Sequence, residues 1–393
     1  MSSNPFRFGA PVEGRRLIGR DGARTELLRA LGEGRSLALT APRGMGKTSL
    51  LLSVLEAWRA QGGHGIYVDL FPAINTRRFA EIYASAMALE PSRTVESMQE
   101  AVQQLVPSFM PRVTITGSGK PGLQLDLWDR ERDIQRLLER ILDAPGELAT
   151  QTDSPLIVIL DDFEDLLAVA ESSLLQSLAQ SIRRQRNVAY VFVLRKEPTA
   201  SDSFDKAKSP FHRLAEPVAL EPVPEQAMVL GLEERFRDAG VKTEVDLLFS
   251  LVEMADHAPH YVLLLAHSLY ETSRDDGTAT EAHLREALQH VLGVSGYGYR
   301  FVWDDLSLHQ RNLVLAMAQG YTERLHSQRM VFQLGLGSPS TVSKNLRRLG
   351  DREIVQKTEQ SVRFVDPFFG EWLRRRMTRS EEHTSELQSH API

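Results

Sequence analysis

Short apolar runs alternate with helical patterns over the first 220 residues of the chain. We expect buried strands at residues 36–40, 65–70, 156–160, 188–194 and 217–220. Between Asp129 and Asp143, apolar residues recur at helical spacing and charged residues occupy the other side. Strands that are apolar on both faces are typical of a parallel sheet enclosed by helices. The pattern therefore predicts an α/β core over residues 17–223, a parallel sheet with helices on both faces.

The pattern differs outside this core. Residues 1–16 contain two prolines and predict an extended N-terminal arm. Residues 112–127 alternate on either side of a glycine-rich turn, which predicts a hairpin inserted into the core. Residues 224–299 predict an all-helical lid domain. Residues 300–378 predict three short helices and then two short strands, the order typical of a winged-helix domain.

Composition and charge narrow the class of protein. The chain has 393 residues, 42% hydrophobic and 25% charged, as in ordinary globular proteins. The absence of cysteine excludes disulfides, thiolate zinc sites and cysteine nucleophiles. A net charge of −6 argues against a polycation that coats nucleic acid. The chain shows neither a secretory signal nor an apolar run of about 20 residues, so we expect a cytoplasmic protein without a membrane segment.

A glycine-rich segment, residues 41–48, follows the first predicted strand and precedes a helix. It matches the phosphate-loop template G-x-x-x-x-G-K-[ST], except that alanine replaces the first glycine. Glycines let the backbone N–H groups converge on phosphate oxygens, and the helix N-terminus favours an anion. We expect Lys47 to reach the β- and γ-phosphates and the Thr48 hydroxyl to bind Mg²⁺. The predicted nucleotide-binding residues here are Arg43, Gly44, Met45, Gly46, Lys47, Thr48 and Ser49.

Acidic residues follow the predicted strand at residues 156–160. Because ligands of α/β sheets bind at the carboxyl ends of strands, we expect Asp161 to hold Mg²⁺ together with Thr48. Asp162 or Glu164 would orient the attacking water for hydrolysis. The extra strand at residues 65–70 is typical of the P-loop branch in which a carboxylate prepares that water.

With these motifs, the chain resembles the archaeal-type P-loop ATPases of the STAND class, relatives of AAA+ proteins, over most of residues 4–376. Residues 4–9 together with Ile18, Gly19 and Arg20 resemble the entry signature of this family. The resemblance implies that Gly19 and Arg20 lie on the adenine side of a bound nucleotide, and that ATP with Mg²⁺ is the cofactor.

The resemblance extends to further positions. Arg195 matches the sensor position that responds to the γ-phosphate, with a surface arginine as the alternative. Arg213 matches the region of an arginine finger, and Pro259 matches the lid proline that abuts the base. Two residues before this proline, the family carries glycine and this chain carries His257. Residues 366–372 resemble the segment that follows the family's winged helix.

The winged-helix region is basic, whereas the remainder of the chain is acidic. Residues 300–379 contain 14 Lys and Arg against 8 Asp and Glu. In the third helix, Lys344, Arg347 and Arg348 share a face opposite the apolar residues, as in a recognition helix. These residues predict a DNA-binding surface. The alternatives are a solvated face or a contact with the nucleotide domain.

The C-terminal residues 379–393 resemble the in-frame translation of a sequencing-library adapter, so we expect this tail to be artefactual. For the rest of the chain, the predicted function is a nucleotide-switch ATPase in signalling or regulation, with MgATP between core and lid. A nucleotide-regulated DNA-binding regulator or initiator-like factor is the alternative, and a non-hydrolysing scaffold is the third interpretation. ATP, ADP, a protein partner or a second copy of the chain are the expected partners.

Overall fold

A computed structural model of the chain describes residues 4–11, 17–89, 111–115, 121–125, 131–195, 204, 207–358 and 361–389. The chain forms two compact units, which we describe separately. The ATPase unit comprises Pro11–Ala41 and Met45–Glu221. The C-terminal unit comprises Met1–Ala10, Pro42–Gly44 and Pro222–Ile393.

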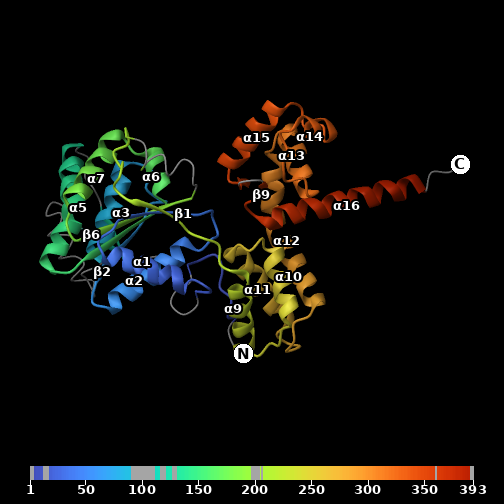
Figure 1. Cartoon of the computed structure of the whole chain (residues 1–393), viewed down its shortest axis with the longest axis horizontal. Coiled ribbons are helices and arrows are strands. Elements are labelled where there is room, and N and C mark those ends of the chain that lie inside the picture. The colour runs from blue at the N-terminus through green and yellow to red at the C-terminus, as the bar shows by residue number, and fades with distance from the viewer. Residues whose placement is uncertain are drawn as a thin grey trace. The chain divides into compact units, whose positions relative to one another are not determined.

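The ATPase unit is built on a five-stranded parallel sheet, as predicted (Figure 1). The strand order is β2-β5-β6-β1-β7, so β1, the first strand in the chain, lies between β6 and β7, the last two strands of this sheet. The strands are β1 (Leu37–Thr40), β2 (His64–Asp69), β5 (Leu156–Asp161), β6 (Val188–Leu194) and β7 (Glu216–Ala219).

Helices cover both faces of this sheet, because successive residues of the central strands point to opposite sides. Ile157 and Ile159 pack in the core under α1 and α2, whereas Val158 and Leu160 pack in the core under α3, α5 and α7 (Figure 1). The helices are α1 (Asp21–Gly32), α2 (Lys47–Ala60), α3 (Thr76–Leu89), α5 (Glu131–Gln151), α6 (Phe163–Val169) and α7 (Ser172–Arg184).

Two predictions about these elements were wrong in detail. The strand expected at residues 217–220 was predicted to be buried, but β7 is an edge strand that pairs only with β1 and is mostly exposed. Its Pro217 fits an edge, where a missing N–H costs no ladder hydrogen bond. The helix expected to end at Asp143 continues through Pro145 to Gln151.

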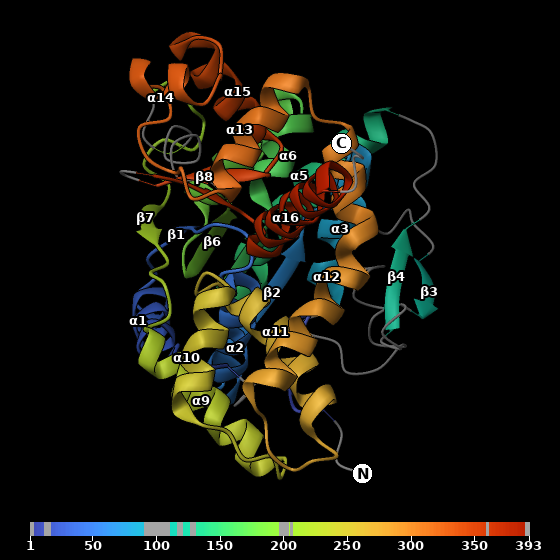
Figure 2. The ribbon, with the colours of Figure 1, turned by 90° about the vertical axis from the view of Figure 1, so that its right-hand side faces the viewer.

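The inserted hairpin consists of β3 (Pro111–Ile115) and β4 (Pro121–Leu125), which pair antiparallel with Val113 opposite Leu123 (Figure 2). The alternation in the sequence thus predicted the pairing. Residues 117–120 of the predicted turn lie outside the described part of the chain.

In the C-terminal unit, helices are followed by the helix-helix-helix-hairpin order predicted for a winged helix and then by a last helix, α16. The long helix α12 runs without a break through residue 300, where we expected the lid to end. The elements are α9 (Glu225–Asp238), α10 (Val245–Met254), α11 (Pro259–Ser273), α12 (Glu281–Asp304), α13 (Leu308–Ala318), α14 (Gln328–Gln333), α15 (Pro339–Asp351), β8 (Val355–Lys357), β9 (Val362–Phe364) and α16 (Pro367–Ser389).

The N-terminal segment is anchored to the helices of this unit. Phe6 is buried, and its ring lies 4.5 Å from that of Phe236 on α9. Asn4 Nδ2 donates to the carbonyl of His267 at 3.1 Å, and His267 Nδ1 lies 2.8 Å from the carbonyl oxygen of Phe6. Residues 4–11 form neither helix nor strand, and this described part of the predicted arm packs on the helices of the unit.

At the other end of the chain, α16 continues to Ser389, so the described part of the suspected adapter tail is helical. A helix can form in either a natural or an artefactual tail, and the origin of residues 379–393 stays a prediction. Among the described residues, we find no helix with the length and apolar character that crossing a bilayer requires.

Candidate functional site

The phosphate loop turns twice between β1 and α2. Gly44 and Gly46 both have φ of +81°, in the left-handed region that side-chain-bearing residues seldom adopt. A Cβ on Gly46 would meet nothing within 4 Å, so glycine is required there for its backbone conformation and not for lack of space. Helix α2 begins at Lys47, and its first turn carries no acidic residue. This geometry suits an anion, because the first N–H groups of a helix have no partner within the helix.

Lys47 lies buried at the start of α2. Its Nζ donates to the carbonyl oxygen of Ala41 at 2.7 Å. Burial lowers the pKa of Lys47, and the carboxylates of Glu164, Asp161 and Asp162 oppose this change. The ammonium group is therefore held in a dry position beside several negative charges.

Asp161 ends β5 and is only 4% exposed. Thr48 Oγ1 and the Tyr67 hydroxyl donate to the same oxygen, Oδ2, at 2.7 and 2.8 Å. The backbone N–H of Asp162 donates to Oδ1 at 3.0 Å. The structure thus brings together Thr48 and Asp161, the two residues that the sequence predicts as metal ligands.

Arg195 follows β6 and contacts three acidic side chains. Its Nε lies 2.6 Å from Glu164 Oε1 and 3.2 Å from Asp162 Oδ1, and the guanidinium also pairs with Asp165. The arginine side chain is 13% exposed, which argues against the interpretation as a plain surface residue. Burial raises the pKa of both Asp162 and Glu164, and the positive charge of Arg195 counteracts this rise.

The residues present fit a magnesium–nucleotide complex. Five carboxylates gather at this edge of the sheet beside the cations Lys47 and Arg195, namely Asp69, Asp161, Asp162, Glu164 and Asp165. Yet the described residues contain no group of three or more His, Asp or Glu that would hold a metal by itself. Mg²⁺ characteristically uses one or two protein oxygens and completes its shell with phosphates and water. Thr48 and Asp161 form such an incomplete set.

The side chain of Arg20 forms its hydrogen bonds with main-chain carbonyl groups. Its guanidinium donates to the carbonyl oxygens of Glu221 and, at 2.9 Å, Met45, so it links the start of α1 to the phosphate loop. The side chain is buried, which lowers its pKa. Gly19, directly before it, has φ of +63°. Placement of Gly19 and Arg20 on the adenine side stays a prediction.

The predicted lid residues belong to the C-terminal unit, and so do Arg43 and Gly44 of the phosphate loop. Within that unit, the carbonyl of Gly44 accepts a hydrogen bond of 3.1 Å from the backbone N–H of His260, and Arg43 pairs with Glu353 at 3.3 Å. Pro259 is the first residue of α11. His257 has φ of +56°, in the left-handed region that glycine adopts without strain, and it stands where the family pattern has glycine.

The other predicted arginine of the core, Arg213, is exposed and has φ of +56°. Its backbone N–H donates to the carbonyl of Phe204 at 3.0 Å. Met45 and Ser49 are half-buried, at the end of the phosphate loop and in the first turn of α2. A role for Arg213 as an arginine finger stays a prediction.

Helix α15 of the winged helix has the two faces that the sequence predicts. Val342 and Leu349 are buried, whereas Lys344, Arg347 and Arg348 are exposed. Ser338 caps the helix, since its side chain accepts a hydrogen bond from the backbone N–H of Thr341 at 3.2 Å. The three basic side chains are therefore available on the surface of this domain.

Sequence reasoning missed three residues of the site, Tyr67, Asp69 and Asp165. Tyr67 donates to Asp161, and Asp165 pairs with Arg195. A signal existed for the first, because Tyr67 lies two residues before the end of a strand that also ends in an acid, Asp69. The register pairs Asp69 with Asp161, which brings both strand ends together.

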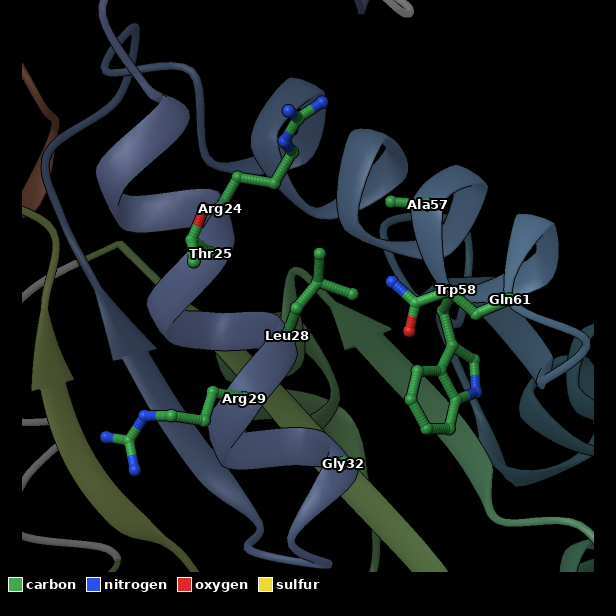
Figure 3. A pocket seen from close by; sticks show the side chains of 8 residues that line it. All are labelled: Arg24, Thr25, Leu28, Arg29, Gly32, Ala57, Trp58 and Gln61. Atoms are coloured by element: carbon green, nitrogen blue, oxygen red, sulfur yellow. The ribbon is translucent and has the colours of Figure 1, made fainter.

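A separate groove of about 520 Å³ lies between α1 and the C-terminal half of α2 (Figure 3). Trp58 forms one wall, and its Nε1 donates to the carbonyl of His64 at 3.0 Å. Figure 3 shows Leu28 pointing toward the groove and Arg29 pointing away from it. None of the predicted nucleotide-binding residues lines this groove, which is lined by Arg24, Thr25, Leu28, Arg29, Gly32, Ala57, Trp58 and Gln61.

Two family models match the chain. The model described as "AAA ATPase domain" matches residues 16–194, and the model described as "Probable winged helix domain" matches residues 297–375. The first match includes the phosphate loop and Asp161, and the second includes α15. Among proteins with curated descriptions, none matches the chain.

Solved structures share the fold at low sequence identity. The Walker-type ATPase paby2304 of Pyrococcus abyssi has a TM-score of 0.65 at 17% identity, and the match covers 93% of this chain and 99% of that one. The ORC2 protein of Aeropyrum pernix, in ADPNP and ADP complexes, has a TM-score of 0.56 at 16% identity, with 96% and 98% covered. The ORC1 protein of Aeropyrum pernix in complex with DNA has a TM-score of 0.50 at 15% identity, with 91% and 93% covered. These likenesses establish the fold.

Proposed function

We propose that this chain is a Mg²⁺-dependent ATPase acting as a nucleotide switch in signalling or regulation, because its sequence matches the models of an AAA ATPase domain and of a winged helix domain. The observation that carries this proposal is the hydrogen bond of 2.7 Å between Thr48 and Asp161, directly beside the phosphate loop. The ORC2 structure holds ADPNP and ADP on the same fold, which supports an adenine nucleotide here.

The chain's own residues divide the work of hydrolysis. Lys47 provides a buried positive charge for the terminal phosphates, and the N–H groups of the loop and of the first turn of α2 bind their oxygens. Thr48 and Asp161 would hold Mg²⁺, which would supply further charge neutralisation for the phosphates when bound. Asp162 or Glu164 accepts a proton from the attacking water, and both lie beside Arg195.

Arg195 suits the role of a sensor. It contacts both candidate bases, so any change in its position alters the charge around them. A third acid, Asp165, holds the guanidinium from the same helix, α6. In this proposal, Arg195 responds to the nucleotide and thereby changes the orientation of the base.

The C-terminal unit supports a switch because lid and winged helix are joined rigidly within it. Helix α12 is shared by both domains. The Tyr299 hydroxyl on α12 donates to Asp366 Oδ2 at 2.9 Å, and Arg363 on β9 pairs with Asp256 after α10 at 3.4 Å. A motion of the lid would therefore move the winged helix with it, as in rigid-body switching.

Phosphate release from MgATP by the full chain tests the ATPase. We expect Lys47→Ala to abolish ATP binding, because the principal positive charge for the phosphates is removed. We expect Asp162→Asn or Glu164→Gln, whichever removes the base, to retain ATP binding and lower kcat about 100-fold or more. Lys242→Ala, an exposed lysine of the other unit, is the matched control.

No phosphate release and no ATP binding by the wild type would contradict the proposed function. Full activity of both acid variants would contradict only the proposed role of these two carboxylates as the base. The proposed ATPase function would stand. Loss of turnover in one of the two, with ATP affinity intact, identifies the base.

Regulated DNA binding is the second candidate function, and the exposed basic face of α15 favours it. The ORC1 protein, whose structure contains DNA, shares the fold with this chain. A helix with Lys344, Arg347 and Arg348 on its outer face suits the major groove and its phosphates. In this interpretation, the nucleotide sets the conformation in which the winged helix meets DNA.

A further inference from the structure

The phenol of Tyr67 has no part in the roles proposed above. Tyr67 lies on the edge strand β2 and donates to Asp161 Oδ2 at 2.8 Å. Thr48 donates to the same oxygen from α2, and the backbone N–H of Asp162 donates to Oδ1. The carboxylate of Asp161 is thus held by side chains from two other elements, β2 and α2, and by the N–H of the residue that follows it.

These contacts nearly exhaust the acceptor capacity of the carboxylate. A carboxylate offers about four acceptor positions, two on each oxygen. Donors from the described residues take both positions on Oδ2 and one on Oδ1. Without Tyr67, one side-chain donor, Thr48, and the N–H of the next residue would remain. Tyr67 adds a second side-chain donor from the neighbouring strand, which restricts the carboxylate further.

The surroundings of Tyr67 keep its hydroxyl a donor. Its ring is half-buried against the core under α1 and α2, which fixes its direction. A tyrosine phenol has an ordinary pKa of about 10, so near neutral pH it carries the proton that it donates to Asp161.

We propose that Tyr67 is a positioning residue that fixes the Asp161 carboxylate for Mg²⁺ at the phosphate loop. The inference rests on the proposed ATPase function and deepens it. Groups that orient metal ligands from outside the coordination shell contribute strongly to metal affinity, commonly about 10- to 100-fold. Tyr67 stands in that relation to Asp161 and, through the shared oxygen, to Thr48.

Tyr67→Phe tests the proposal, because it keeps the packed ring and removes only the hydroxyl. Mn²⁺ is the probe, titrated into the full chain saturated with ADP and followed by electron paramagnetic resonance. We expect Mn²⁺ to bind about 10-fold more weakly than in the wild type. ADP affinity measured in EDTA should be unchanged, and MgATP turnover should recover when Mg²⁺ is raised in excess.

Tyr190→Phe is the matched control. Tyr190 lies on β6 of the same sheet, and its hydroxyl donates to Gln185 at 2.6 Å, away from the carboxyl edge. This variant should leave Mn²⁺ affinity unchanged even if it lowers stability.

Two results would overturn the inference while the proposed ATPase stands. One is wild-type Mn²⁺ affinity in Tyr67→Phe, and the other is an equal loss of ADP affinity in EDTA, which would indicate a general structural role. A wild-type chain that binds neither ADP nor Mn²⁺ would instead overturn the proposed function, and the inference with it.

Discussion

Arginine has different surroundings and different proposed roles in the two units of this chain. Arg195 in the ATPase unit is 13% exposed and contacts three acids. Arg347 and Arg348 in the winged helix are exposed on the outer face of α15. Charges removed from water interact strongly with their neighbours, whereas exposed charges are screened by solvent and salt. The difference indicates fixed geometry at the first site and adjustable attraction at the second.

The largest expected effect on folding comes from breaking the cluster around Arg195. Arg195→Leu leaves Asp162, Glu164 and Asp165 without their shared counter-charge. Because these acids are themselves about one-third exposed, we expect the free energy of unfolding to fall by about 2 kcal/mol, less than for a fully buried pair. Urea denaturation of the full chain measures this change.

An exposed ion pair in the same unit gives the control for that comparison. Arg184 is 62% exposed and pairs with Asp143 at 3.0 Å. We expect Arg184→Leu to change the free energy of unfolding by no more than about 0.5 kcal/mol. Equal effects of the two leucine variants would show that burial does not separate these arginines, and the comparison would fail.

The contrast also shows what the sequence could predict and what it could not. The phosphate loop and Asp161 were predictable, because a glycine pattern and an apolar strand ending in acid are local features. Tyr67 and the pairing of Arg195 with α6 depend on strand order. In this sheet β5 lies between β2 and β6, which are distant in the chain, and periodicity carries no information about such neighbours.

For the same reason, the sequence did not reveal which strands lie at the edges of the sheet. The strand at β7 has an apolar sequence, yet it pairs on one side only and is mostly exposed. A strand's burial depends on how many neighbours it has, and the sequence of a single strand does not reveal that number. The winged helix was easier to predict, because its order of three helices and a hairpin is consecutive in the chain.

DNA binding tests the proposed role of the exposed basic residues on α15. If Lys344, Arg347 and Arg348 contact phosphates, their triple alanine variant should bind duplex DNA more weakly. The plot of log affinity against log salt should become shallower by about 2.7, or 0.9 for each lost contact. Fluorescence anisotropy at several salt concentrations, with and without MgATP, measures both quantities.

A control for this test removes equal charge elsewhere in the same unit. Arg237, Lys242 and Arg285 are exposed in the lid, and their triple alanine variant should keep the wild-type salt slope. The DNA-binding interpretation is excluded if the wild type shows no salt-dependent binding. It is also excluded if the two triple variants behave alike.

The smallest expected effect is a shift in pH dependence at the buried cluster. Burial raises the pKa of Glu164, as do Asp162 and Asp165, and Arg195 opposes the rise. If Glu164 is the base of the two candidates, it must be ionised, so kcat should increase with pH through a midpoint above that of an exposed glutamate. Removing Arg195 takes away the opposing charge, and the midpoint in Arg195→Leu should move further upward.

The sign for stability follows from the same raised pKa. The native state binds this proton more tightly than the unfolded chain does, so the contribution of Glu164 to stability is present at low pH. It is lost as pH rises from the usual glutamate pKa through the raised one.

Residual turnover of Arg195→Leu, measured across pH at saturating MgATP, shows the shift of the kcat midpoint. A midpoint that stays in place, or moves downward, would mean that Arg195 does not govern the ionisation of Glu164. The arginine would then act on the site through geometry alone, and Arg195→Lys, which keeps the charge and alters the contacts, should be as impaired as Arg195→Leu.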